Sequence, residues 1–249
     1  MVQELLYTLV SVLIVSAISL IGISAFLVSA LRLEKVLHFI VSFSAGALLG
    51  DALLHLIPEV ADDGMTTQTS LAILFGIIVF FVLEKFLHWH HCHLHEKECK
   101  HGGVKPYVYL NLIADGMHNF IDGLVIGASY IVSIPVGVAT TTAVVFHEIP
   151  QEIGDFAILI KGGFSKSKAL LYNFFSAATA ILGGLLAFLL ATPKFVDLIL
   201  PLTAGGFIYV ALADLIPELH KEPTLGRSVH HLLGLLLGIM VMILLLMLE

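Results

Sequence analysis

Apolar runs long enough to cross a lipid bilayer recur along nearly the whole chain. A transmembrane helix needs about 20 residues, and charged residues, Gly and Pro separate eight apolar segments of about this length. The segments are residues 5–31, 35–58, 70–89, 106–131, 135–161, 168–191, 195–219 and 228–248. With 58% hydrophobic and 12% charged residues, the chain is too apolar for a soluble protein of 249 residues. The sequence therefore predicts an all-α polytopic membrane protein, with residues 1–249 forming a single transmembrane domain.

The basic residues predict how these segments are oriented. If the N-terminus is outside, the loops at 32–35, 84–105, 161–168 and 220–228 are cytoplasmic. Those loops hold eleven of the twelve Lys and Arg residues, and only Lys194 remains outside. This distribution agrees with the positive-inside rule. We therefore expect eight transmembrane helices with both termini outside.

The second and seventh segments end in similar sequences. Residues 45–59 read Ala-Gly-Ala-Leu-Leu-Gly-Asp-Ala-Leu-Leu-His-Leu-Ile-Pro-Glu, and residues 204–218 read Ala-Gly-Gly-Phe-Ile-Tyr-Val-Ala-Leu-Ala-Asp-Leu-Ile-Pro-Glu. Because the two spans are five apart, they cross the membrane in opposite directions. Inverted repeats are typical of transporters that work by alternating access. The alternative is that Leu-Ile-Pro-Glu is a common way for a helix to leave the membrane. The repeat favours a 3+2+3 inverted-repeat arrangement.

The fourth and fifth segments carry polar side chains near the middle of the membrane, where a charged group costs several kcal/mol. Residues spaced by three or four positions share one face of a helix. In the fourth segment this face consists of Asn111, Asp115, His118, Asn119 and Asp122. In the fifth it consists of His147, Glu148, Gln151, Glu152 and Asp155. Two such stripes on consecutive antiparallel helices can face one another, as a cation path, a proton relay or a metal centre would require.

The side chains in these stripes favour a metal centre. Imidazole, carboxylate and amide groups without a thiolate suit Zn²⁺, Fe²⁺ or Mn²⁺ and disfavour Cu(I). A single histidine in a membrane helix is often only a hydrogen-bonded link between helices. Two histidine–acid pairs in matching positions, His118 with Asp122 and His147 with Glu148, favour metal binding instead. Asp115, like its counterpart Asp155 in the fifth segment, either orients the ligands or joins the helices.

These two motifs closely resemble the signatures of the Zrt/Irt-like (ZIP) metal transporters. They are His-Asn-Phe-Ile-Asp-Gly at 118–123 and His-Glu-Ile-Pro-Gln-Glu-Ile-Gly-Asp at 147–155. The nearest subgroup has His-Glu-x-Pro-His-Glu-x-Gly-Asp in span 5, and the resemblance extends over all eight spans. It implies a homodimeric importer that carries divalent transition metals, Zn²⁺ foremost and Fe²⁺, Mn²⁺ or Cd²⁺ as further candidates, to the cytoplasm by elevator-like alternating access. The metal is substrate, and no catalytic cofactor is expected.

The resemblance also implies a binuclear metal centre between spans 4 and 5. The ligands it implies are His118, Asn119, Asp122, His147, Glu148 and Gln151. At position 151 the subgroup has His and other branches have Glu, so this chain offers a weaker, uncharged amide. Some members add a carboxylate from span 6, where this chain has only Asn173 and Ser176. The sequence therefore leaves open whether one metal ion or two bind here.

Further polar residues are expected along the route to and from the centre. At the outer end of span 2 the entrance candidates are Asp51, His55 and Glu59. In the matching part of span 7 the exit candidates are Asp214, Glu218 and His220. The alternative for both sets is capping and hydrogen bonding at a helix end.

The predicted cytoplasmic loop 88–105 is rich in histidine. Its candidate metal ligands are His90, His91, Cys92, His93, His95, Cys99 and His101. In a reducing compartment the two cysteines suit metal contact better than a disulfide bond. The composition favours a flexible, low-affinity metal collector or sensor, and the alternative is a tract with no ordered role.

Two other protein classes share part of this pattern. An intramembrane zinc metalloprotease has His-Glu-x-x-His, but position 151 is Gln and Pro150 distorts the turn, so no enzyme is expected. Cation-diffusion exporters use similar His–Asp pairs, but they usually have six spans and a cytoplasmic C-terminal domain. A pure metal sensor would show the same site and loop. The net charge of −7 argues against nucleic acid, and the lack of a long N-terminal ectodomain favours a prokaryotic plasma (inner) membrane.

Overall fold

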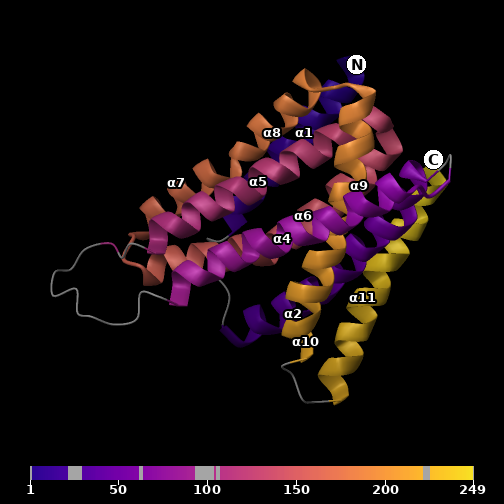
Figure 1. Ribbon diagram of the computed structural model, residues 1–249. Coiled ribbons are helices and arrows are strands. Elements are labelled where there is room, and N and C mark those ends of the chain that lie inside the picture. The colour runs from indigo at the N-terminus through magenta and orange to yellow at the C-terminus, as the bar shows by residue number, and fades with distance from the viewer. Residues whose placement is uncertain are drawn as a thin grey trace.

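The computed structural model describes residues 2–21, 30–61, 64–92, 104, 107–220 and 225–248, and all regular structure in them is helical (Figure 1). The α-helices are α1 (Val2–Ile18), α2 (Ala30–Gly50), α3 (Ile57–Val60), α4 (Thr67–Cys92), α5 (Tyr107–Val132), α6 (Ile134–Lys161), α7 (Lys166–Ala177), α8 (Thr179–Leu189), α9 (Pro193–Tyr209), α10 (Ile216–His220) and α11 (Leu225–Leu245). Two π-helical turns, η2 (Asp51–Leu56) and η3 (Val210–Leu215), and 3₁₀ turns at residues 19–21 and at η4 (Leu246–Leu248) complete them.

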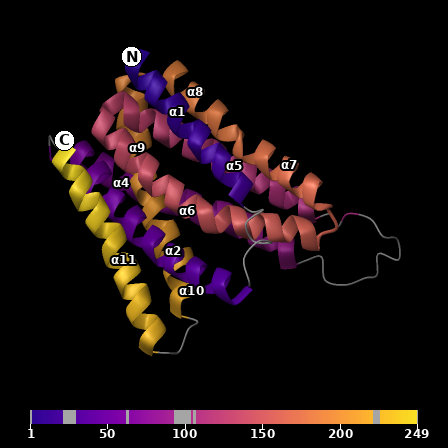
Figure 2. The same cartoon turned by 180° about the vertical axis from the view of Figure 1, so that it is seen from behind.

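Five helical stretches in the described part of the chain are long and apolar enough to cross a membrane. They are residues 2–21, 36–60, 166–189, 194–220 and 226–245. Such a series of apolar helices is that of a polytopic membrane protein. Helices α5 and α6 are not among the five because the polar stripes of the sequence lie on them. The start of α1 and the end of α11 lie at the same end of the bundle (Figures 1 and 2).

Two predicted boundaries are wrong. The loop expected at 32–35 lies inside α2, which begins at Ala30, so the first span cannot extend to residue 31. Helix α4 continues to Cys92, so the first residues of the predicted loop are helical. In both places charged or polar residues end an apolar run without ending the helix. At 32–35 the residues are Arg, Leu, Glu and Lys, which are good helix formers. The sixth predicted span corresponds to the apolar stretch 166–189, within which Ala178 separates α7 from α8.

Glycines allow the principal helix pairs to pack backbone against backbone. The pairs are α5 with α8, α2 with α11 and α4 with α9. A Cβ atom at Gly46 of α2 would overlap the carbonyl group of Leu235 on α11. A Cβ atom at Gly205 of α9 would overlap the carbonyl group of Ile73 on α4. Because Gly46 and Gly205 hold matching positions in the repeated sequence, the α2–α11 contact occurs a second time as α9–α4.

Both copies of the repeated sequence also contain a π-helical turn at the same place. After each turn an amide donates to the carbonyl group five residues earlier, Ile57 to Ala52 and Ile216 to Ala211. A proline follows directly in each copy. Proline has no N–H group and its ring crowds the carbonyl group four residues earlier, and the wider π turn makes room for it. Turn η2 packs against α9, and η3 packs against α2.

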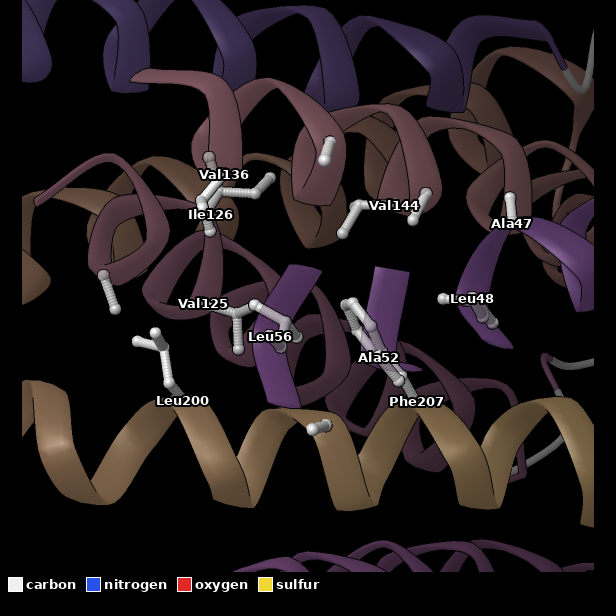
Figure 3. Packing of buried hydrophobic residues seen from close by; sticks show 14 of the residues in the cluster. Ala47, Leu48, Ala52, Leu56, Val125, Ile126, Val136, Val144, Leu200 and Phe207 are labelled. Carbon is white, nitrogen blue, oxygen red and sulfur yellow. The ribbon is translucent and has the colours of Figure 1, made fainter. Parts of the chain in front are cut away.

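A continuous apolar core joins these helices near the connection between α5 and α6. Figure 3 shows side chains of several helices packed together, including Val125 and Ile126 of α5, Val144 of α6 and Leu200 of α9. These side chains are at most 2% exposed. Burying apolar area of this kind is worth about 25 cal/mol per Å² where it removes the surface from water. The apolar core therefore holds α5 and α6 together next to the part of each helix that carries the polar residues.

Candidate metal centre

Four of the predicted ligands converge at the middle of the α5–α6 pair. His118 and Asp122 lie one turn apart on α5, and His147 and Glu148 are consecutive on α6. Residues four apart on a helix face the same way, so both α5 side chains can reach α6. One ligand atom from each of the four residues lies within 4.8 Å of the others. Among the described residues this is the one such group of three or more His, Cys, Asp or Glu side chains.

The separations between these ligand atoms are nearly equal. Nε2 of His147 lies 3.2 Å from Oδ2 of Asp122 and 3.4 Å from Oε1 of Glu148. Nε2 of His118 lies 3.5 Å and 3.3 Å from the same two oxygens. The two Nε2 atoms are 3.3 Å apart. Four ligands about 2.0–2.1 Å from one tetrahedral zinc ion would be about 3.3 Å from one another. These five separations therefore agree with those of a tetrahedral zinc site.

The charge and burial of the four groups also suit a cation. Glu148 is fully buried, and neither of its carboxylate oxygens accepts a hydrogen bond from the described residues. Removing an ionised carboxylate from water costs several kcal/mol unless a positive partner compensates. With both imidazoles neutral, Asp122 and Glu148 together carry two negative charges. One divalent cation would balance that charge.

The ring of His147 is held in position from two sides. Its Nδ1 lies 3.2 Å from the carbonyl oxygen of Ala143. A proton on Nδ1 donated to that oxygen leaves the lone pair of Nε2 directed at the other ligands, as in many zinc sites. The edge of Phe207 from α9 packs against the same ring, with centroids 6.2 Å apart. By contrast, the side chain of His118 is 19% exposed, which makes it the accessible side of the centre.

Three amide–carboxylate pairs lie next to the four-residue cluster and not in it. The Asn119 side-chain amide donates to Oδ1 of Asp115, at 2.8 Å. Asn111 donates to Oδ1 of Asp155, also at 2.8 Å, and so joins α5 to α6. The third pair joins α7 to α6 through a hydrogen bond that Asn173 donates to Glu152. The sequence predicted five of these six residues as site or pathway groups, and Asn111 only as part of the polar stripe. It did not predict that they pair with one another.

Two of the predicted ligands are placed differently from the other four. The amide nitrogen of Asn119 is used by Asp115, and its Oδ1 is buried with no hydrogen bond from the described residues. Gln151 is partly buried and lies one turn beyond His147 on α6. Neither residue is a member of the four-residue cluster. Their metal-binding roles stay predictions.

Half of the entrance and exit candidates lie on the π turns, and the others lie on the short helices that follow. Asp51 and His55 are buried on η2, where Nε2 of His55 lies 3.0 Å from the carbonyl oxygen of Met242 on α11. Glu59 is exposed beyond them. In the matching half the three exit candidates, Asp214, Glu218 and His220, are exposed. Of the loop candidates, His90, His91 and Cys92 lie at the end of α4, and His93, His95, Cys99 and His101 lie outside the described residues.

The surroundings of the cluster differ at its two ends. Toward the α5–α6 connection the next buried side chains are apolar, with Val125 and Val144 at most 2% exposed. Toward the start of α5 and the end of α6 they are polar, with Asp115 and Glu152 nearest. An ion leaving the cluster would meet oxygen ligands on one side and hydrocarbon on the other. We call the side of the centre that carries Asp115 and Glu152 the polar approach.

Contacts between the metal centre and α2 were not predicted. The hydroxyl group of Ser44 donates to the carbonyl oxygen of Phe146 at 2.6 Å. The ring of Phe43 packs on the ring of Phe146, with centroids 4.3 Å apart. Since Phe146 precedes His147, both contacts tie α2 to the backbone of the centre. A serine among apolar residues in span 2 was the only available signal, and serine is common in membrane helices.

Comparison with known proteins identifies related sequences over most of the chain. The profile of a family described as "ZIP Zinc transporter" matches residues 5–105 and 89–246. Zinc transporter ZIP13 of Pongo abelii is 38% identical over 222 residues, which cover 82% of this chain and 65% of that protein. Zinc transporter zipt-7.1 of Caenorhabditis briggsae is 32% identical over 271 residues, covering 82% and 69%. Zinc transporter SLC39A7 of Mus musculus is 33% identical over 306 residues, covering 88% and 64%. The chain thus spans about two thirds of the length of these relatives.

Proposed function

The chain belongs to the ZIP family of zinc transporters, and we propose that it carries divalent transition-metal ions, zinc foremost, across a membrane into the cytoplasm. The observation that supports this most directly is the tetrahedral spacing of His118, Asp122, His147 and Glu148 inside a bundle of apolar helices. A transporter for zinc needs a zinc-binding site buried among its apolar helices. Relatives named as zinc transporters favour transport over proteolysis.

The polar approach supports the direction of transport. It runs from the metal centre toward Lys161, at the end that the positive-inside rule places in the cytoplasm. An ion that reaches the centre can leave it past Glu152, Asp155 and their amide partners. The apolar side chains around Val125 and Val144 close the other side in this conformation. Alternating access would require these apolar contacts to open when the ion enters.

Eight spans in a 3+2+3 inverted-repeat arrangement, with both termini outside, remain our proposed topology. The repeated packing of Gly46 and Gly205 and the repeated π turns η2 and η3 support it. A homodimer is proposed from the family resemblance alone. A prokaryotic plasma membrane was the expectation for its location, and the relatives named above are animal proteins that lend it no support.

Transport can be tested by uptake of radioactive zinc into proteoliposomes that contain the purified protein. We expect uptake that saturates with zinc and that excess Fe²⁺ or Mn²⁺ inhibits less strongly than excess unlabelled Zn²⁺, because tetrahedral His–carboxylate sites suit zinc. Liposomes without protein supply the background rate. Zinc that leaves preloaded vesicles but never enters them from outside, whichever way the protein inserts, would contradict the proposed importer.

Replacing Gln151 with histidine is expected to tighten zinc binding on the order of tenfold, because a neutral imidazole is a stronger zinc ligand than an amide. Gln151 lies one turn beyond His147 on the helix that carries two of the four ligands. Zinc affinity of the purified Gln151→His variant would be measured by equilibrium dialysis beside wild type. Gln151→Leu, which keeps the side-chain size and removes the amide, is the matched control and should bind no more tightly. Unchanged affinity in Gln151→His would count against position 151 as a ligand position.

A further inference from the structure

A second pair of histidine rings meets outside the metal centre. The rings of His38 on α2 and His231 on α11 have centroids 5.7 Å apart and planes at 84°. In the metal centre, the rings of His118 and His147 have centroids 5.5 Å apart and planes at 88°. The two pairs therefore have nearly the same ring separation and tilt, although they join different helices.

We propose that His38 and His231 form a second binding site for a divalent transition-metal ion. Two imidazoles that bind one zinc ion through nitrogens about 2.0–2.1 Å away have ring centroids roughly 5 Å apart. The observed separation is within a small side-chain rotation of that value. Imidazole is a good ligand for zinc, nickel and copper. Water molecules complete the coordination, so this site binds more weakly than the four-ligand centre.

The two helices hold this pair in a fixed place. A Cβ atom at Gly234 would overlap the Ser42 side chain and lie 3.1 Å from the carbonyl oxygen of Phe39. The backbones of α2 and α11 are therefore in direct contact within one turn of both histidines. His231 is 8% exposed. A site carried by rigid, closely packed helices loses little freedom when it binds an ion.

The pair lies away from the metal centre along α2. Ser44, which contacts the residue before His147, is six residues after His38, and six helical residues span about 9 Å. The pair thus lies toward the start of α2 and α11. This is the end predicted to face the cytoplasm. A role in receiving released metal would depend on the proposed transport, whereas binding itself would not.

Zinc binding to the full chain carrying His147→Ala separates the two sites. In that background the expected result is that His38→Ala/His231→Ala loses one bound zinc ion per chain in equilibrium dialysis with radioactive zinc. Ligands in the loop contribute equally to every variant and cancel in the comparison. The matched control is His230→Ala, since His230 is exposed and its Nδ1 lies 2.7 Å from the carbonyl oxygen of Gly226 in its own helix. It should retain the zinc ion.

A further variant distinguishes metal binding from simple packing of two rings. His38→Phe keeps an aromatic ring against His231 but removes the ligand nitrogens, so it should lose the zinc ion and keep the melting temperature of the metal-free protein. Zinc retained in His38→Phe or in the double alanine variant overturns the proposal. So does a loss of zinc confined to the double alanine variant and accompanied by a lower metal-free melting temperature, since the pair would then be structural.

Discussion

Replacing His147 with alanine is expected to lower the zinc uptake rate of proteoliposomes about a hundredfold or more, because even partners behind metal ligands contribute 10–100-fold to affinity. The change removes the nitrogen that lies 3.2 Å from Asp122 and 3.4 Å from Glu148. It leaves two buried carboxylates with one imidazole between them. Zinc affinity in dialysis should fall together with the uptake rate, since the same atoms bind and conduct the ion.

The specificity of this effect is checked with His230→Ala, which removes a histidine of the same size at an exposed position. Its uptake should equal that of wild type. Circular dichroism and the elution volume of each purified variant would show that the fold is retained. Uptake by a folded His147→Ala protein within twofold of wild type would mean that the ion does not pass through this centre.

Replacing Gly183 with leucine should prevent stable folding or lower the melting temperature in detergent by roughly 5–10 °C, because overpacking costs about 1–3 kcal/mol or more. A Cβ atom at this position of α8 would overlap the carbonyl oxygen of Phe120 and the amide nitrogen of Leu124 on α5. Both neighbours are backbone atoms of a helix, so they cannot rotate away. Displacing α5 would also move His118 and Asp122, and zinc binding should weaken in any protein that still folds.

The matched control is Gly226→Leu, the same substitution at a helical glycine where an added Cβ meets nothing within 4 Å. Its melting temperature should stay within about 2 °C of wild type, since exposed substitutions usually change stability by no more than about 0.5 kcal/mol. Equal melting temperatures for the two variants would show that the α5–α8 contact is looser than the structure indicates.

Much of the fold follows from the spacing of apolar residues. Each predicted segment is helical over nearly all the residues that the structure describes, because a backbone that avoids water has to satisfy its own hydrogen bonds. Boundaries at polar residues were less certain, and Ala30 begins a helix six residues before the apolar part of α2. The sequence also did not predict which helices pack against one another. Gly46 is visible as a small residue, but the sequence does not show that it meets Leu235.

The metal centre was predictable in its residue types and less so in its connections. Helical periodicity placed His118 with Asp122 on one segment and identified the His147–Glu148 pair on the next, and the resemblance to a family implied that all four are ligands. The sequence could not sort these side chains from their polar neighbours, because the same periodicity also includes Asn119. The structure turns the amide of Asn119 to Asp115 and leaves four groups at tetrahedral spacing. Which polar side chains can reach one metal ion depends on the distance between α5 and α6, and helix packing sets that distance.

The paired π turns bear on how the two halves of the chain arose. A π turn forms when one extra residue is inserted into an α-helix and the helix on either side keeps its phase. Turns η2 and η3 occupy the same place in both copies of the repeated sequence. A single insertion in an ancestral half, followed by duplication, accounts for both with the fewest events. The bulge would then be older than the present eight-segment chain and would have been inherited twice.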